Sequence, residues 1–479
     1  MSELNNKIVN ATKWSSITEI LARLITPITS IVLARLLTPE AFGVVTTLTM
    51  VITFAEIFTD AGFQKYLIQH EFKDDIDKEQ STNVAFWSNL IMSLLIWLLI
   101  GIFSEPLASL VGNPGLGNVL IIACISIPLA AFSSIQMALF KRALDFKTLF
   151  KVRVVAISIP LLVTIPLAFI LESYWALVLG TIASNFANAI VLTIYSEWKP
   201  KFFYSFAKLR EMFSFSVWSV VEAISIWLTG YVDIFIIGVY LNEYYLGLYK
   251  TSMTVVGQIM GLITASTTPI LFSSLSRLQT DEEAFRTMFF KFQKLVGMLV
   301  IPLGVGIFCF SDLVTLILLG SQWMEASSFI GLWGLTSALT IVLSHYSSEV
   351  YRAMGRPKLS VVAQILHIAV LWPAVLIAVE YGFEVLTITR SLVRIELILV
   401  NLLIMCITVK ISPWKMFANI SYSVLASIIM AVVALEIKQI SLSLLWQIIS
   451  VAICVVVYFI IIIVFPSNRM ILRSFINHK

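Results

Sequence analysis

Two pairs of charged residues interrupt long apolar runs of this sequence at a spacing of one helical turn. Glu19 and Arg23 form the first pair, and Arg390 and Arg394 form the second. A charge that faces lipid is costly, so ionisable residues within apolar spans usually face a cavity or a bundle interior. An arginine in such a place suits a phosphate, because its planar guanidinium group donates two hydrogen bonds at once. The three arginines are therefore candidate ligands for a phosphate-bearing anion.

Each pair also has an interpretation that needs no ligand. Glu19 and Arg23 could neutralise each other across one turn and stiffen their helix. Arg390 could extend to the outer interface while Arg394 pairs with an acid of another helix. Glu396 is close in sequence, but it stands two residues from Arg394 and cannot face both arginines. Both interpretations stay open for each pair.

Acidic residues and histidines form a second group of candidates. Glu56 and Asp60 lie four residues apart and repel each other unless a proton, a cation or a basic partner intervenes. They either pair with Arg23 or Lys65, or form the ion site that drives a cycle. Candidates for ion coupling or charge pairing are Glu19, Glu56, Asp60 and Glu222. His345 and His367 are expected to hydrogen-bond each other or a backbone carbonyl, with a proton relay as the alternative, since histidine titrates near neutral pH.

The elements that position these residues are membrane-spanning helices. Of the 479 residues, 59% are hydrophobic and only 13% are charged, and the mean hydropathy is +0.94. Apolar runs of about 20 residues can cross a bilayer as helices and are too continuous for the strands of a membrane barrel. Fourteen spans are predicted, at 14–35, 41–67, 84–104, 117–140, 150–171, 174–196, 213–240, 246–272, 292–311, 327–351, 359–380, 384–409, 416–436 and 443–465.

The distribution of basic residues fixes the expected orientation. Lysine and arginine collect on the cytoplasmic side of membrane proteins. With the N-terminus inside, most of them fall on inner segments, as in the group Lys141, Arg142, Lys147, Lys151 and Arg153. An error of one span would scramble this alternation. We therefore expect a multi-pass membrane protein with both termini in the cytoplasm.

A repeated motif indicates an all-α protein built from two related lobes. The stretch Leu37–Gly43 (LTPEAFG) resembles Leu241–Gly247 (LNEYYLG), and Trp14-Ser15 recurs at the same spacing as Trp218-Ser219. The prediction is two pseudo-symmetric six-helix lobes and a C-terminal helix pair. The N-terminal lobe covers 1–196 (spans 1–6), a cytoplasmic linker 197–213, the C-terminal lobe 214–410 (spans 7–12), and the helix pair with a cytoplasmic tail 411–479.

Four stretches resemble the Wzx-type polysaccharide flippases, within the multidrug/oligosaccharidyl-lipid/polysaccharide exporter superfamily. They are LARLLTPEAFG (33–43), FTDAGFQKYLIQ (58–69), SLSRLQTD (274–281) and YRAMGRP (351–357). The resemblance extends over most of the first 360 residues, and the four stretches follow one another in the order that the family shows. The last spans match only in pattern.

The resemblance implies two lobes around a cavity that opens alternately to each side. It also implies a substrate, an oligosaccharide on undecaprenyl diphosphate, that moves from the inner to the outer leaflet of the bacterial cytoplasmic (inner) membrane for O-antigen, capsule or exopolysaccharide synthesis. Arg23, Arg390 and Arg394 are then the candidate ligands of its diphosphate. Expected partners are this lipid-linked oligosaccharide, membrane lipids, H⁺ or Na⁺, and the polysaccharide polymerase with its chain-length machinery. Trp218, Trp227 or Tyr231 could stack on sugar rings.

Other functions fit the sequence less well. No phosphate-binding loop of an ATPase, zinc-ligand set or catalytic nucleophile stands out, so we expect no enzyme activity, no cofactor, no metal site and no nucleic-acid partner. A membrane polymerase would need a larger outer loop than the longest one expected, Phe310–Ser327, which holds only Asp312 and Glu325 as acids. A cation-coupled drug antiporter of the same superfamily, the main alternative, would favour cavity acids over arginines and twelve spans over fourteen.

Overall fold

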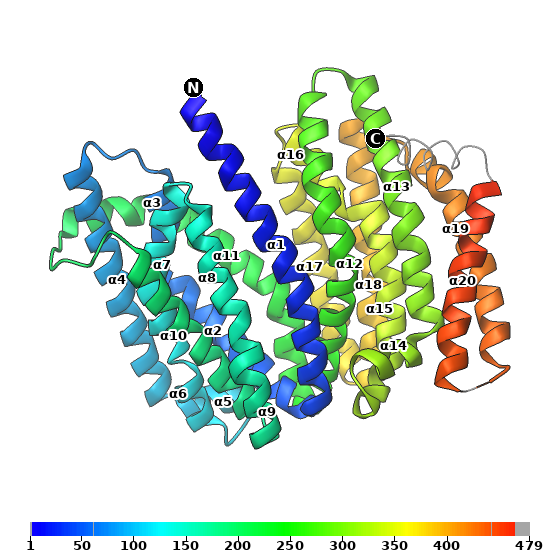
Figure 1. Cartoon of the computed structure of the whole chain (residues 1–479), viewed down its shortest axis with the longest axis horizontal. Coiled ribbons are helices and arrows are strands. Elements are labelled where there is room, and N and C mark those ends of the chain that lie inside the picture. The colour runs from blue at the N-terminus through cyan, green and yellow to red at the C-terminus, as the bar shows by residue number, and fades with distance from the viewer. Residues whose placement is uncertain (1, 61, 442, 465–479) are drawn as a thin grey trace. The chain divides into compact units, whose positions relative to one another are not determined.

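The computed structural model describes residues 2–60, 62–441 and 443–464, with the side chains at 2–9, 214–219 and 222 left aside. Within these ranges the regular structure is entirely helical. Fourteen helices there are long and apolar enough to cross a membrane, which confirms the predicted number of spans. The chain folds as two compact units, Met1–Gly247 and Leu248–Lys479, whose helices are coloured along the chain in Figure 1.

The first unit contains the helices of the first seven spans and their short companions. They are α1 (Ser2–Leu36), α2 (Pro39–Asp60), α3 (Phe63–Gln69), α4 (Asp75–Ile102), α5 (Ser104–Leu110), α6 (Gly117–Ala123), α7 (Ser126–Arg142), α8 (Phe146–Ile159), η1 (Pro160–Thr164), α9 (Ile165–Leu171), α10 (Trp175–Tyr195) and α11 (Phe206–Tyr240). Helix α11 packs against α2, α3 and α4. The lobe boundaries expected from the sequence stay a prediction.

Span 2 is shorter than predicted. Helix α2 ends at Asp60, and α3 starts only after Gly62, whose φ of 79° is left-handed. An ordinary side chain is strained at such an angle, and glycine is not. The chain therefore breaks where hydropathy alone continues the span to residue 67.

The second unit begins within α12 (Glu243–Arg277), which starts in the first unit. It continues with α13 (Glu282–Cys309), α14 (Ser311–Leu318), η2 (Ser321–Ala326), α15 (Ser327–Thr340), η3 (Ile341–His345), α16 (Ser347–Ala353), α17 (Lys358–Val379), α18 (Phe383–Val409), α19 (Pro413–Lys438) and α20 (Leu444–Val464). Helix α15 packs against α13 and α18, and α17 packs along α18.

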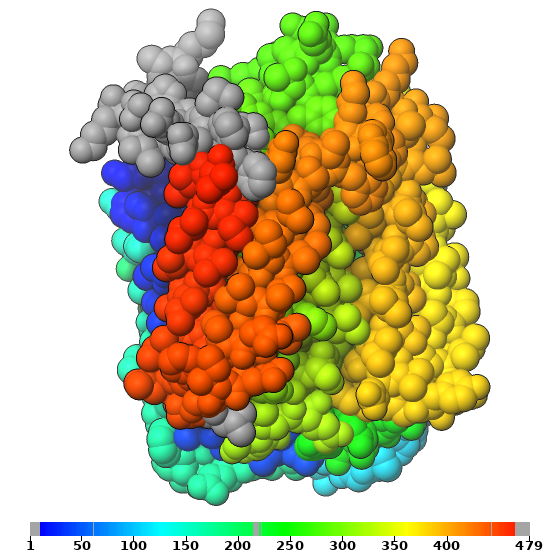
Figure 2. All heavy atoms as spheres, turned by 90° about the vertical axis from the view of Figure 1, so that its right-hand side faces the viewer, coloured from blue at the N-terminus to red at the C-terminus, as the bar shows by residue number. Residues whose placement is uncertain are grey.

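The last two helices form the predicted C-terminal pair. Figure 2 shows α19 and α20 side by side on one face. Helix α19 also packs on α13, and the buried hydroxyl of Tyr458 in α20 donates to the carbonyl of Met298 in α13 at 2.8 Å. The pair thus packs on the rest of the second unit through α13, by apolar contacts and a buried hydrogen bond.

The two copies of the repeated motif contact each other reciprocally within the first unit. A Cβ built on Gly43 would lie 1.8 Å from the carbonyl oxygen of Glu243, and one built on Gly247 would lie 1.8 Å from the carbonyl oxygen of Pro39. Each glycine therefore allows the start of its own helix to approach the backbone at the start of the other. The repeat seen in the sequence corresponds to a symmetric backbone contact between α2 and α12.

Candidate functional site

The arginines of α18 lie on one face of the helix and turn toward α15 and α12. Arg390 is buried, and its Nε donates to the hydroxyl of Tyr249 at 3.1 Å. Arg394 donates from Nη1 to the hydroxyl of Ser337 at 2.6 Å. Residues four apart share a helix face, so the sequence spacing already places both guanidinium groups together. The buried position of Arg390 contradicts the expected extension of its side chain to the outer interface. Diphosphate binding by Arg390 and Arg394 stays a prediction.

An indole ring lies against both guanidinium groups. The Arg394 guanidinium carbon is 3.9 Å from the ring centroid of Trp333, and that of Arg390 is 5.0 Å from the same ring. Each distance is within the range of a cation–π interaction, which needs no opposite charge. Among the described residues Arg394 forms no ion pair. The alternative, in which Arg394 pairs with an acid of another helix, is therefore wrong for the described residues.

The ring is itself held by an aromatic column. Phe329 stacks on Tyr249 with centroids 5.2 Å apart and packs against Trp333 at 5.6 Å. Phe329, Trp333 and Ser337 follow at four-residue intervals, so one face of α15 supplies the column and the hydroxyl. We call Tyr249, Phe329, Trp333, Ser337, Arg390 and Arg394 the arginine site. Its aromatic members were not predicted from the sequence, although the F-x-x-x-W-x-x-x-S spacing was readable.

A histidine–carboxylate pair lies on a different face of α18, since Glu396 stands two residues from Arg394. The Nδ1 atom of His367 in α17 is 2.9 Å from Glu396 Oε2. His367 is only 5% exposed. His345, by contrast, has its Nε2 3.5 Å from the Thr268 hydroxyl. The expected hydrogen bond between the two histidines is wrong, because their helix faces meet different neighbours.

In α1 the Glu19–Arg23 pair is present. Arg23 Nη2 lies 2.7 Å from Glu19 Oε1, and both side chains are more than a third exposed. This is the self-neutralising arrangement expected as one of the two interpretations. A role of Arg23 in binding diphosphate stays a prediction, since an exposed i, i+4 pair is weak and can exchange one partner for another.

The acids of α2 occupy the last turns of that helix. The Oδ1 atom of Asp60 is buried and has no hydrogen-bond partner among the described residues, and Lys65 is close enough for its charge to act on the carboxylate. Glu56 lies one turn earlier and is partly buried. An ion-coupling role for these two acids stays a prediction. The side chains of Glu222 and Trp218, two further candidates, lie outside the described part of the chain.

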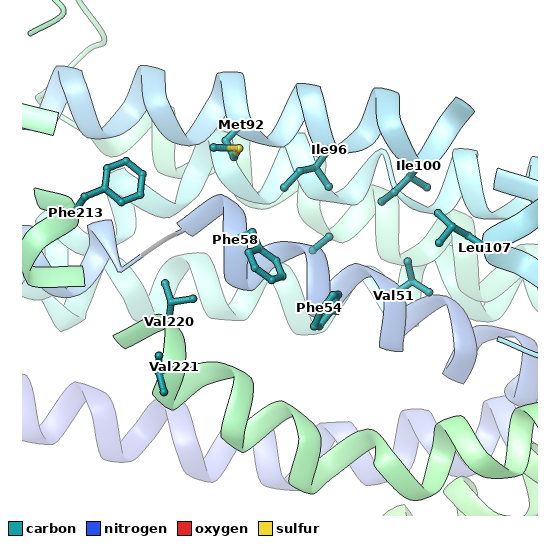
Figure 3. Close-up of a pocket in the computed structure, with 11 residues that line it drawn as sticks. Val51, Phe54, Phe58, Met92, Ile96, Ile100, Leu107, Phe213, Val220 and Val221 are labelled. Carbon is teal, nitrogen blue, oxygen red and sulfur yellow. The ribbon is translucent and has the colours of Figure 1, made fainter. Parts of the chain in front are cut away.

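One cavity of the first unit is lined by apolar side chains only. Its volume is about 640 Å³, and Figure 3 shows Phe54 and Phe58 of α2 facing side chains of α4 across it. It is lined by Val51, Phe54, Ala55, Phe58, Met92, Ile96, Ile100, Leu107, Phe213, Val220 and Val221. Such a wall suits hydrocarbon and gives a sugar or a phosphate nothing to bond.

Trp227 and Tyr231, named above as possible sugar platforms, stack on each other beside this cavity. Their centroids are 5.4 Å apart, and Phe54 packs on Trp227 at 4.7 Å. The indole Nε1 of Trp227 donates to the Thr53 hydroxyl at 3.2 Å. Phe54 and Tyr231 therefore both contact the Trp227 indole. Stacking of Trp227 or Tyr231 on a sugar ring stays a prediction.

No group of three or more His, Cys, Asp or Glu that could hold a metal occurs in the described ranges.

Comparison with known proteins identifies the family. A family model described as "Polysaccharide biosynthesis protein" matches residues 32–328, well over half of the chain. The chain belongs to this family.

Three curated relatives are distant in sequence but similar over much of their length. The succinoglycan biosynthesis transport protein ExoT of Rhizobium meliloti (strain 1021) is 24% identical over 64% of this chain, which spans 62% of that relative. The teichuronic acid biosynthesis protein TuaB of Bacillus subtilis (strain 168) is 21% identical, with 75% of this chain and 74% of TuaB covered. The lipopolysaccharide biosynthesis protein WzxC of Escherichia coli (strain K12) is 21% identical over 67% and 65%.

Solved structures establish the kind of fold. The lipid II flippase MurJ in an inward closed conformation matches with a TM-score of 0.75 and 16% identity, over 95% of this chain and 99% of MurJ. An inward-facing multidrug transporter of the MATE family matches with a TM-score of 0.62 and 14% identity, over 84% and 98%. The protein is thus a multi-pass membrane protein with the fold of these transporters, as expected from the resemblance found in the sequence.

Proposed function

We propose that the protein moves an undecaprenyl-diphosphate-linked oligosaccharide from the inner to the outer leaflet of the bacterial cytoplasmic membrane. The observation that carries the proposal is the arginine site: two guanidinium groups one turn apart, held by hydroxyl groups and one indole. A carrier lipid of this kind presents two neighbouring phosphates, and paired arginines are suited to them. Membership of the polysaccharide biosynthesis family supports a polysaccharide precursor as the substrate class.

In this proposal the residues have distinct roles. Arg390 and Arg394 bind the diphosphate, and Arg23 is a third ligand when its pair with Glu19 opens. Glu56, Asp60 and Glu222 serve ion coupling or charge pairing with H⁺ or Na⁺. Two lobes, 1–196 and 214–410, rock about the site and expose it to each side in turn. Both termini face the cytoplasm, and the exported units pass to the polymerase and chain-length machinery.

A drug/cation antiporter is the second candidate, favoured by the likeness to the MATE-family structure. Two arginines in a membrane interior argue against a cationic cargo, because like charges repel. A polymerase is less suited still: the predicted outer loop forms the short helices α14 and η2, and Asp312 there lies 3.8 Å from the Lys438 amine.

Deletion of the gene separates these candidates. We expect loss of surface polysaccharide while lipid-linked repeat units accumulate on the cytoplasmic side, measured by mass spectrometry of extracted lipids and restored by a plasmid copy. The purified protein in vesicles should exchange a defined diphosphate-linked oligosaccharide between leaflets, with and without a pH or sodium gradient. Normal surface polysaccharide in the deletion strain would overturn the proposal, and drug sensitivity alone would favour the antiporter.

A further inference from the structure

The apolar cavity between α2 and α4 is part of a longer groove, to which the proposed diphosphate site gives no role. A second cavity, of about 120 Å³, lies between α2, α3, α4 and α11. It shares Phe58, Met92 and Phe213 with the cavity of about 640 Å³, so the two form one continuous depression. Among the described residues that line either cavity, none carries a charge. We call this depression the α4 groove.

The α4 groove is longer than one leaflet of a membrane is deep. Figure 3 shows Met92, Ile96 and Ile100 of α4 one after another along it. Its lining on α4 runs from Ser88 to Ile100, which is about 18 Å at the rise of an α-helix, whereas the hydrocarbon of one leaflet is about 15 Å deep. The midpoint of the predicted span 84–104 falls between Met92 and Ile96. The groove therefore has walls in both leaflets.

One end of the α4 groove is polar. The Ser88 hydroxyl and the Tyr204 hydroxyl lie 3.1 Å apart there, and the Trp87 indole next to Ser88 donates to the carbonyl of Lys201 at 2.9 Å. The amine of Lys201 is largely exposed and pairs with Glu79 at 2.6 Å, a surface contact that an anion can replace. These residues stand on the side predicted to be cytoplasmic. A lipid in the groove consequently has its polar head at the inner interface and its tail toward the outer leaflet.

The walls of the groove select a chain by shape and length. Phe54 and Phe58 meet edge to face with centroids 5.1 Å apart, and Phe213 meets Phe63 in the same way at 5.8 Å. Because a membrane already surrounds any lipid tail with hydrocarbon, entry into the groove brings no hydrophobic gain, and only packing contacts favour it. A methyl-branched chain makes more contacts with such rings than a straight chain does. A phospholipid acyl chain also ends within its own leaflet, and this groove does not.

We propose that the α4 groove binds the polyprenyl chain of the carrier lipid while its phosphate-bearing head is still at the inner interface. The chain then lies along Met92, Ile96 and Ile100 of the first unit, and the head lies near the Ser88 and Tyr204 hydroxyls before it passes to the arginine site. This inference rests on the proposed function, since it takes the polyprenyl-linked sugar as the substrate.

Photolabelling of the purified full-length protein in detergent micelles tests the inference. The probe is undecaprenyl-diphosphate-linked N-acetylglucosamine with a diazirine in the middle of its chain, and tandem mass spectrometry locates the label. We expect labels on the peptides that contain residues 51–58 and 92–100, removed by excess unlabelled probe lipid but not by an equal concentration of phosphatidylglycerol. Labels confined to other helices, or equal protection by the phospholipid, would overturn the proposal.

A filled groove tests the chain separately from the head. Ile96→Trp narrows the groove, and Leu98→Trp is its control, because Leu98 is exposed on α4 and lines neither cavity. By titration in native mass spectrometry, Ile96→Trp should bind the undecaprenyl-linked sugar about three- to tenfold more weakly, a modest change because packing alone is lost. Leu98→Trp should bind it as the native protein does.

A short-chain probe shows that the variant is folded. The chain of geranyl-diphosphate-linked N-acetylglucosamine is too short to reach Ile96 from Ser88, about 12 Å along the helix, so its affinity should be the same in Ile96→Trp and in the native protein. Equal affinity of Ile96→Trp and Leu98→Trp for the undecaprenyl-linked sugar would overturn the groove. Leaflet exchange by the native protein without chain-specific labelling would overturn the groove alone, and chain-specific labelling without exchange would overturn the proposed function alone.

Discussion

Arg394 lies over the indole of Trp333, with its guanidinium carbon 3.9 Å from the ring centroid. The ring is 6% exposed, so this cation rests on a surface that water barely reaches. A cation–π contact stabilises a guanidinium group without neutralising it. The positive charge consequently stays available for an anion, which a carboxylate in the same place would have cancelled.

Replacing Trp333 by leucine should therefore weaken anion binding while leaving both arginines in the protein. Cation–π contacts contribute about 0.5–2 kcal/mol, so the dissociation constant of a diphosphate probe, farnesyl-diphosphate-linked N-acetylglucosamine, should rise by about two- to thirtyfold. Trp333→Phe should keep part of the effect, because a smaller aromatic face remains. Titration of the purified variants measures this. Trp372→Leu, at an exposed tryptophan of α17, is the control, and equal affinity of Trp333→Leu and Trp372→Leu would contradict the role of the ring.

The pair Glu19–Arg23 allows its two interpretations to be separated. If Arg23 meets diphosphate, Arg23→Ala should reduce export more than Arg23→Lys, and adding Glu19→Gln to Arg23→Ala should not restore it. If the pair only neutralises itself, the double variant Glu19→Gln/Arg23→Gln should export nearly as the native protein does, because no unpaired charge is left in the span. We expect the first result, measured as surface polysaccharide in the complemented deletion strain. Full activity of the double variant would exclude Arg23 from the binding site.

The sequence predicted the helices and the spacing of the arginine pair, because hydropathy and the helical period are local properties. It did not predict which side chains of other helices these residues contact. Which face of α18 meets α15, and which meets α17, depends on how the three helices pack together, and no local property of the sequence encodes this. This is why His367 was matched with His345 and not with Glu396. The break after Asp60 was missed for a similar reason: the left-handed angle of Gly62 is not visible in an apolar run.

The reciprocal approach of Gly43 and Gly247 predicts a strong response to a single methyl group. Gly43→Ala places a Cβ 1.8 Å from the Glu243 carbonyl oxygen, so backbone must move. Overpacking of this kind costs about 1–3 kcal/mol, and the variant should unfold at a lower temperature in detergent. Gly257→Ala is the control, because no atom lies within 4 Å of the position of its Cβ. Equal melting temperatures of the two variants would contradict the close contact, and Gly247→Ala should repeat the loss.

Arg142 fastens the segment that follows the break in span 2. Its Nη1 donates to the carbonyl oxygens of Leu67 at 2.8 Å and His70 at 2.7 Å, and its guanidinium carbon lies 4.6 Å from the Phe72 ring centroid. These carbonyls terminate α3, where the helix has no further amides to satisfy them. A single planar group thus holds the end of a helix and an aromatic ring at once.

Arg142→Lys keeps the charge but loses this geometry, since an ammonium group cannot present a flat face to Phe72 while it bonds to both carbonyls. We expect a loss of about 1–3 kcal/mol of stability and faster hydrogen exchange confined to residues 63–72. Arg153→Lys, at an exposed arginine of α8, should change neither the stability nor the hydrogen exchange of residues 63–72. Hydrogen exchange with mass spectrometry resolves the two regions. Arg142 lies far from the arginine site in the sequence and contacts none of its members. The affinity for the diphosphate-linked sugar probe should therefore be unchanged in Arg142→Lys. A loss of affinity without local exchange would show that Arg142 acts on the ligand and not on α3.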